Sequence, residues 1–142
     1  MQEDIIKKIH AQARRLGACQ LFKGSETLEE IIDLFLSPQG QEFFVKNRFP
    51  NIATVRLFKG MGVEKHGIYI DAGVITLKNP SKAVLIGRTS ATVNCDTLEQ
   101  HEVILMHGAK ATVNAQKWAV VKVTCGDGSS VIRNVFNNAI IL

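Results

Sequence analysis

The sequence predicts an α+β fold, in which a small N-terminal helical cap is followed by a short β-solenoid of either hand. Three observations support this prediction. Apolar residues recur at helical spacing within residues 1–66, and an alternation with a period of two begins at residue 67. Beyond that point, glycine-rich or polar turns separate short aliphatic triplets. The triplets recur about every twenty residues, which is typical of stacked architectures.

Residues 1–66 carry start signals for several short helices, and we expect them to form a helical cap region. A first helix is expected over residues 4–16, where apolar residues recur every three or four positions. Thr27 and Glu30 have the pattern of a capping box before a second helix. Pro38 indicates a third helix, because proline is favoured at the first helical position. Asn51 can cap a fourth.

Residues 67–142 are expected to form a solenoid of about four to five rungs, each made of two triplets and two turns. Residues 68–77 match residues 84–93 at a shift of 16, and these match residues 104–113 at a shift of 20. For the next repeat we take shifts of 17 and 19 for the two triplets, which gives residues 121–132. A further shift of 19 gives a final triplet over residues 140–142.

Stacked rungs would pair their backbones in parallel about 4.8 Å apart and enclose an aliphatic interior. We expect the first and third residues of each triplet to point inward. These are Ile68, Ile70, Ile75, Leu77, Val84, Ile86, Ala91, Val93, Ile104, Met106, Ala111, Val113, Val121, Val123, Ile132, Ile140 and Leu142, with Ser130 as the one polar member. The alternative is an antiparallel β-sandwich or jelly roll, which also has short alternating strands. That fold favours strong hairpin dipeptides, of which Asp127-Gly128 is the only example.

The middle residues of the triplets would then face outward in two rows. In the second triplets they are Thr76, Thr92, Thr112 and Val131, which suits a β surface that faces solvent. In the first triplets they are Tyr69, Leu85, Leu105, Lys122 and Ile141, and four of these five are apolar. A contiguous apolar strip marks a contact surface, which either the N-terminal helices or a second subunit would cover.

The final rung has no polar tail after Leu142, and a bare rung exposes unpaired strand edges. Because solenoids need a cap at each end, we expect a homo-oligomer. The interface residues would be Tyr69, Leu85, Leu105, Ile141 and Leu142.

The charge pattern offers one alternative partner. The formal net charge is +4, but the basic residues are spread along the chain, so nucleic acid is not the expected partner. The nearest approach to a basic cluster is Lys7, Lys8, Arg14 and Arg15 on the first predicted helix, which would carry a nucleic-acid-associated function.

Composition also bears on where the protein works. Three cysteines, Cys19, Cys95 and Cys125, give an odd count without a Cys-x-x-Cys motif, which favours reduced thiols and a cytoplasmic location. No apolar run approaches about 18 residues, so we expect no membrane span.

Candidates for chemistry are few. The repeat places Asp71, Gly87, His107 and Thr124 at equivalent positions, which would put Asp71 and His107 two rungs and about 10 Å apart. Cys125 lies beside this column, so Asp71, His107 and Cys125 are the catalytic candidates for an enzyme, or a binding site, that acts on a sugar or other small molecule in a solenoid groove.

We expect neither a metal nor a cofactor. Cys95, His101 and His107 lack the tight spacing of zinc ligands. Around Gly60 and Gly62, the dinucleotide fingerprint would require a third glycine where Lys65 stands.

The rung pattern resembles that of short parallel β-helix proteins. The chain as a whole, with Ser37-Pro38-Gln39-Gly40 and the segment from Gly67 to Gly73, is similar to short uncharacterised bacterial proteins. This resemblance implies a fold but no activity, because folds host unrelated functions. We therefore expect a non-enzymatic protein-interaction or assembly module rather than an enzyme.

Overall fold

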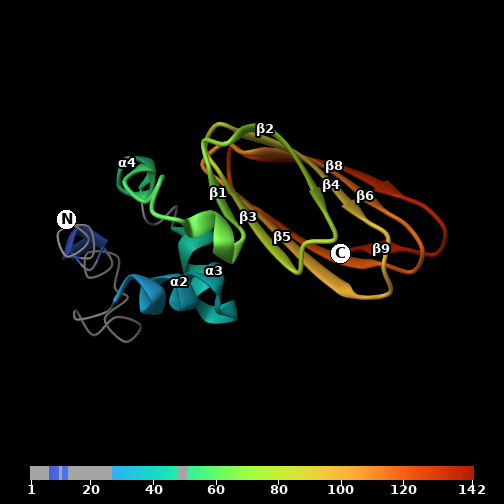
Figure 1. Cartoon of the computed structure of the whole chain (residues 1–142), viewed down its shortest axis with the longest axis horizontal. Helices are drawn as coiled ribbons and strands as arrows, with labels where there is room; N and C mark the ends of the chain where they lie inside the picture. The colour runs from blue at the N-terminus through green and yellow to red at the C-terminus, as the bar shows by residue number, and fades with distance from the viewer. Residues whose placement is uncertain (1–6, 10, 13–26, 48–50) are drawn as a thin grey trace. The chain divides into compact units, whose positions relative to one another are not determined.

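The computed structural model describes residues 7–9, 11–12, 27–47 and 51–142 (Figure 1). The chain divides into two compact units, Met1–Phe58 and Lys59–Leu142. The first contains the α-helices and the second contains the strands. A short 3-10 helix, η1 (Val63–His66), precedes the first strand, so the change from helix to strand lies beside residue 67, whereas the second unit begins earlier, at Lys59.

The helices of the first unit begin where the sequence carries capping residues. Residues 7–9 and 11–12 are helical, and the complete helices are α2 (Leu28–Leu36), α3 (Pro38–Lys46) and α4 (Ile52–Arg56). Thr27, Ser37 and Asn51 each accept a hydrogen bond from the backbone N–H three residues later. Glu30 completes the capping box by accepting from the N–H of Thr27. Most of the helix expected over residues 4–16 lies outside the described residues.

The second unit is a β-solenoid of about four turns, as the sequence predicts. Its strands are β1 (Ile68–Ile70), β2 (Gly73–Lys78), β3 (Lys82–Ile86), β4 (Thr89–Cys95), β5 (Gln100–Met106), β6 (Lys110–Ala115), β7 (Val120–Cys125), β8 (Ser130–Val135) and β9 (Ile140–Ile141). Odd-numbered strands form a five-stranded sheet, here called sheet A, in the order β1-β3-β5-β7-β9. Even-numbered strands form sheet B, in the order β2-β4-β6-β8.

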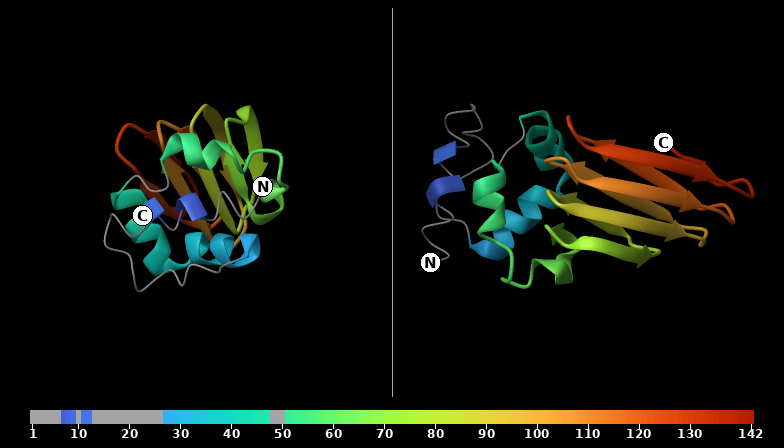
Figure 2. Two further views of the ribbon diagram at one scale, coloured as in Figure 1. Left: turned by 90° about the vertical axis from the view of Figure 1, so that its left-hand side faces the viewer. Right: turned by 90° about the horizontal axis from the view of Figure 1, so that it is seen from above.

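Every strand pair in the two sheets is parallel, which overturns the alternative of an antiparallel sandwich. The successive turns lie over one another in the right-hand view of Figure 2, where the strands follow each other from green to red.

The register is more regular than the triplets predict. The first step is 16 residues in both sheets, and the second is 20, as expected. The third step is also 20 in both sheets, because Ile104 pairs with Thr124 and Ala111 pairs with Val131. The predicted shifts of 17 and 19 were therefore wrong, as was the final 19, since Val121 pairs with Ile141. Matching triplets by composition misses this register, because the last repeat contains apolar residues on both faces of the strand.

In sheet B the predicted side-chain orientation is confirmed. The first and third triplet residues of β2, β4 and β6 belong to the interior cluster or pack against it: Ile75, Leu77, Ala91, Val93, Ala111 and Val113. Thr76, Thr92 and Thr112 form one outward row by register. The fourth member of that row is Ile132 and not Val131, because Thr112 pairs with Ile132.

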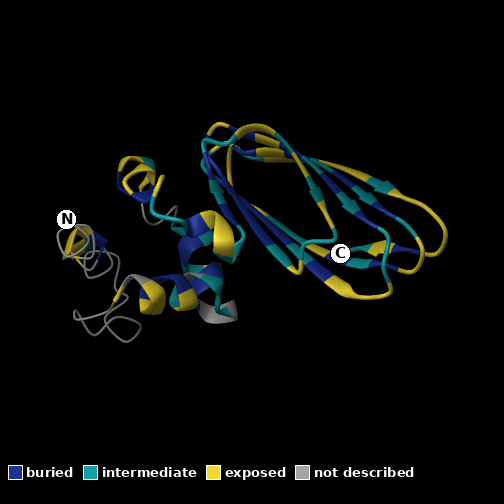
Figure 3. Ribbon diagram, viewed as in Figure 1, coloured by how far each residue is buried: buried dark blue, intermediate teal, exposed yellow. Residues whose placement is uncertain are grey.

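In sheet A the predicted orientation is reversed in β1, β3, β5 and β9, whereas in β7 it is confirmed, because Val121 and Val123 face the interior cluster and Lys122 is exposed. The middle residues of the triplets, Tyr69, Leu85, Leu105 and Ile141, belong to the interior cluster or pack against it. By strand alternation the other triplet residues point away from that interior: Ile68, Ile70, Val84, Ile86, Ile104, Met106, Ile140 and Leu142. The first six of these are nevertheless buried (Figure 3). With aliphatic residues on both faces, the alternation carries no information about which face is inside.

Candidate functional site

The last turn of the solenoid is the main candidate for a contact surface. β8 is the outermost strand of sheet B and β9 is the outermost strand of sheet A. Exposed large apolar side chains concentrate there and on the corner just before it: Trp118, Ile132, Val135, Phe136, Ile140 and Leu142. Elsewhere in the described chain the exposed members of this class are Leu57, Val74 and Leu98. Residues 118–142, a little more than one 20-residue turn, thus carry six of the nine exposed large apolar side chains among the described residues.

Backbone pairing fixes the direction of the side chains in β9. The N–H groups of Ile140 and Leu142 donate to the carbonyl oxygens of Ala119 (2.9 Å) and Val121 (2.7 Å). The carbonyl oxygen of Leu142 accepts from the N–H of Val123 at 3.2 Å. Ile140 and Leu142 therefore point outward, and Leu142 is 64% exposed. Ile141, between them, packs against the interior cluster.

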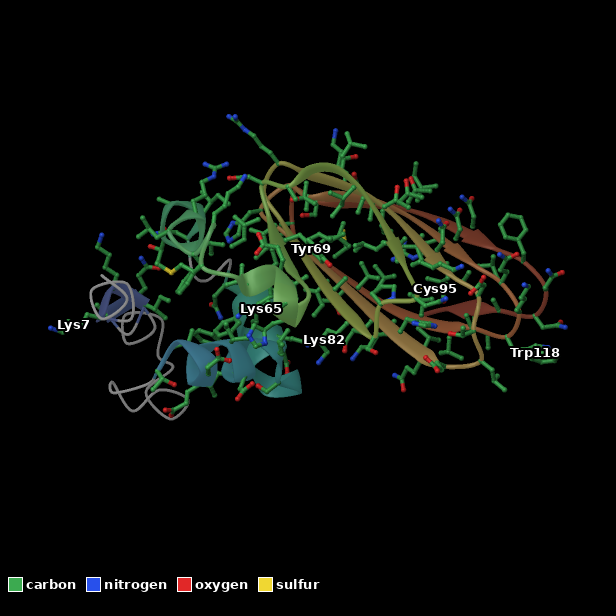
Figure 4. All side chains as sticks on the ribbon, in the orientation of Figure 1. Lys7, Lys65, Tyr69, Lys82, Cys95 and Trp118 are labelled. Carbon is green, nitrogen blue, oxygen red and sulfur yellow. The ribbon has the colours of Figure 1, made fainter. Side chains whose placement is uncertain are left out.

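The apolar strip expected on the outside of the first triplets does not exist as a surface. Leu85 and Leu105 are fully buried members of the interior cluster, and Tyr69 packs against it (Figure 4). Of the five expected interface residues, only Leu142 is exposed. The physical reason is the reversed orientation of sheet A.

Residues missed by the sequence reasoning lie in β8. Ile132 was expected inside, but it is 62% exposed on the outer face. Arg133 pairs with Val113, so it continues an interior column that begins with Leu77 and Val93. A repeat of 20 residues would have placed both correctly. Asn94, Asn114 and Asn134 recur at that spacing, and the same spacing pairs Ile132 with Thr112 and Arg133 with Val113.

The corner between the sheets contains backbone strain. Corner residues 116–119 and 136–139 occupy equivalent positions in successive turns. Both corners place two consecutive residues at positive φ: Asn137 and Asn138 (49° and 64°), and Lys117 and Trp118 (54° and 68°). Asparagine tolerates this left-handed conformation, whereas a bulky tryptophan is an outlier there. Trp118 is also 60% exposed, at the outer corner (Figure 4).

Polar side chains link the turns on the outer face of sheet B. The amide of Asn114 donates from Nδ2 to Oδ1 of Asn94 at 2.9 Å. Asn134 donates in the same way to Oδ1 of Asn114 at 2.8 Å. This asparagine ladder adds side-chain hydrogen bonds to the backbone pairing of β4, β6 and β8.

A second polar cluster closes the corner after β4. Asn79 donates from Nδ2 to Oδ1 of Asp96 (2.8 Å), and its Oδ1 accepts from the N–H of Asp96 (2.8 Å). The hydrogen bond from Asn79 has the largest effect and lowers the pKa of Asp96, burial opposes it, and the charges of Lys78 and Lys117 add smaller lowering effects.

The three catalytic candidates do not converge. Asp71 and His107 occupy equivalent positions two turns apart, with Gly87 between them, as expected. The next member of that column is Asp127 and not Thr124, because Ile104 pairs with Thr124. Cys125 pairs with Leu105, which is a different column. Asp71 is held in the turn structure, where its Oδ1 accepts from the N–H of Arg88 at 2.8 Å.

The residues considered as metal ligands, Cys95, His101 and His107, do not converge either. His101 lies near the start of β5 and His107 directly follows its end, roughly 20 Å away at the usual rise of a strand. The ring of His101 is fully buried, with Nδ1 2.9 Å from the carbonyl oxygen of Pro80 and Nε2 3.3 Å from Oγ1 of Thr97. Cys95 lies between the two sheets (Figure 4), and burial, with a smaller contribution from Asp96, raises its pKa to about 11. Its thiol is therefore protonated and inert at neutral pH.

The basic cluster is only partly within the described chain. Lys7 and Lys8 are exposed on a helical segment, and Arg14 and Arg15 lie outside the described residues. In the part of the chain that the structure describes, no helix has the length and apolar character needed to cross a membrane.

Three comparisons with known proteins found no match, whether against protein-family models, curated proteins or solved structures.

Proposed function

We propose that this protein is a non-enzymatic assembly module that associates with a second copy of itself through the last turn of its solenoid. The observation that carries the proposal is the concentration of exposed apolar side chains on that turn and the adjoining corner. These side chains lie on both sides of the end turn, with Ile132 on the outer face of sheet B and Ile140 and Leu142 on the outer face of sheet A.

The composition of this surface supports a protein partner. Trp118 and Phe136 are aromatic, and aromatic residues are enriched at the energetic centres of interfaces. Leu142 and Ile140 add aliphatic area from β9, and unpaired backbone groups lie along the outer edges of β8 and β9. The free thiols of Cys95 and Cys125 suit the reducing, cytoplasmic location that we propose for the module.

Sedimentation of the full chain across a range of concentrations tests the proposal. We expect a reversible dimer in the micromolar range. Ile132→Lys should weaken it at least about tenfold, because a charge replaces an apolar contact. Val74→Lys is the matched control, since Val74 is 89% exposed on β2, in the first turn. A wild-type protein that stays monomeric at the highest concentration would overturn the proposal, as would equal weakening by both variants.

A further inference from the structure

The open edge of β8 has a defined pattern of backbone groups. The N–H of Ser130 donates to the carbonyl oxygen of Ala109, and the N–H of Phe136 donates to that of Ala115. In a parallel ladder, alternate residues turn both backbone groups to the same neighbour. Ser130, Ile132 and Asn134 therefore direct theirs toward β6. Val131, Arg133 and Val135 direct theirs to the open edge.

Two copies of β8 related by a two-fold axis would pair antiparallel across this edge. Residues directly opposite one another then lie on the same face, and those that exchange hydrogen bonds must both be edge-facing. Within β8 these conditions allow registers centred on Val131, Ile132, Arg133 or Asn134. The four registers differ in what faces Arg133 and in how many residues of β8 pair with β8.

The charge of Arg133 and the number of paired residues decide between them. The register centred on Arg133 sets the two exposed Arg133 side chains directly opposite each other, and like charges so placed are destabilising. The registers centred on Val131 and on Asn134 leave only residues 130–132 and 133–135 of β8, respectively, paired with β8. The register centred on Ile132 pairs residues 130–134, places Arg133 opposite Val131, and buries the exposed Ile132 side chains against each other.

We infer that the two copies join through an antiparallel β8–β8 pairing centred on Ile132, with Arg133 as the residue that sets the register. This inference rests on the proposed self-association and specifies its geometry. Val131 and Arg133 exchange main-chain hydrogen bonds with the partner's Arg133 and the partner's Val131. The β8 edge of each copy is then covered by the other in one two-fold symmetric contact.

Cysteine cross-linking tests this register, because Ile132 would form a non-hydrogen-bonded pair with Cα atoms about 4.5 Å apart, within disulfide range. The background carries Cys19→Ser and Cys125→Ser, and Cys95 stays because it is buried. In a glutathione redox buffer, Ile132→Cys should form a reducible dimer at least about tenfold faster than Asn134→Cys, the matched neighbour on the same face.

Adding Arg133→Val to Ile132→Cys should slow cross-linking several-fold, because the register centred on residue 133 then competes. Faster cross-linking of Asn134→Cys, or no effect of Arg133→Val, would overturn this register while leaving the proposed dimer in place. The register would also be overturned if the Cys19→Ser, Cys125→Ser background sediments as a dimer but neither Ile132→Cys nor Asn134→Cys forms a cross-link. A monomer in sedimentation would instead overturn the proposed function itself.

Discussion

The two sheets of the solenoid use the same parallel stacking but bury their residues differently. In sheet B one face lines the interior, and the other presents threonine and asparagine rows. In sheet A the central strands β3 and β5 carry aliphatic residues on both faces, and both faces are buried. When a strand has one polar face, its sequence indicates which face points to the interior, whereas a strand that is apolar on both faces gives no such indication. Sheet B is therefore held partly by polar ladders, and sheet A by packing.

Truncating an interior residue of sheet A tests the packing side of this comparison. Leu105→Ala should lower the free energy of unfolding by about 2–5 kcal/mol, because Leu105 is fully buried and leaves a cavity. Thermal and urea unfolding measure the loss. Lys122→Ala, on exposed Lys122 of neighbouring β7, should change stability by less than about 0.5 kcal/mol. Similar effects of the two variants would contradict the interior position of Leu105.

Breaking the asparagine ladder tests the polar side of the comparison. Asn114→Ala removes both side-chain hydrogen bonds of the ladder and leaves one donor and one acceptor unpaired in half-buried positions. We expect a loss of about 1–2 kcal/mol in urea unfolding. Asn94→Ala breaks only the bond with Asn114 and should cost less. If the two variants cost the same, the ladder does not stabilise sheet B as a chain of bonds.

Removing the backbone strain at Trp118, in the corner that leads from sheet B into sheet A, should raise the stability of the protein rather than lower it. Trp118→Asn places at φ 68° a residue that tolerates the left-handed region, as Asn138 does one turn later. We expect the protein to gain about 1 kcal/mol of stability, measured by thermal unfolding, and to lose affinity in sedimentation. Asn138→Ala should destabilise the equivalent corner one turn later, because alanine tolerates positive φ less well than asparagine. A destabilised Trp118→Asn would show that the indole packs in the free protein.

The smallest effect is expected at the corner after β4, where Asp96 titrates. Its pKa lies below the ordinary value of 3.8 in the folded protein. Its contribution to stability is therefore complete above pH 3.8 and is lost as the pH falls through the lowered pKa. Asp96→Asn removes this dependence, so the difference in melting temperature between wild type and variant should shrink on acidification from pH 7 to pH 3. An equal difference in melting temperature between wild type and variant at pH 7 and at pH 3 would contradict this prediction.

Sequence reasoning recovered the solenoid because aliphatic triplets and polar turns recur with a measurable period. It recovered the orientation of Thr76, Thr92 and Thr112 because a threonine row next to an alanine–valine row distinguishes the two faces. It failed at Leu85 and Leu105 because both neighbours in the sequence are equally apolar. Ile132 and Arg133 were misplaced because the last repeat departs from the aliphatic pattern, so matching triplets by composition chose a shift of 19 where the backbone register is 20.

The step of 20 residues, which holds after the first turn, has a consequence for how the chain folds and how it can change. Each turn touches only the turns before and after it, so ordering can spread from one turn to the next without waiting for distant segments to meet. The same property makes length adjustable. Removing residues 110–129 would bring Ser90 over Ser130 and Gln100 over Ile140 still in register, so that a shorter coil of the same cross-section results. A lineage could lengthen or shorten this protein by whole turns while leaving its last surface intact.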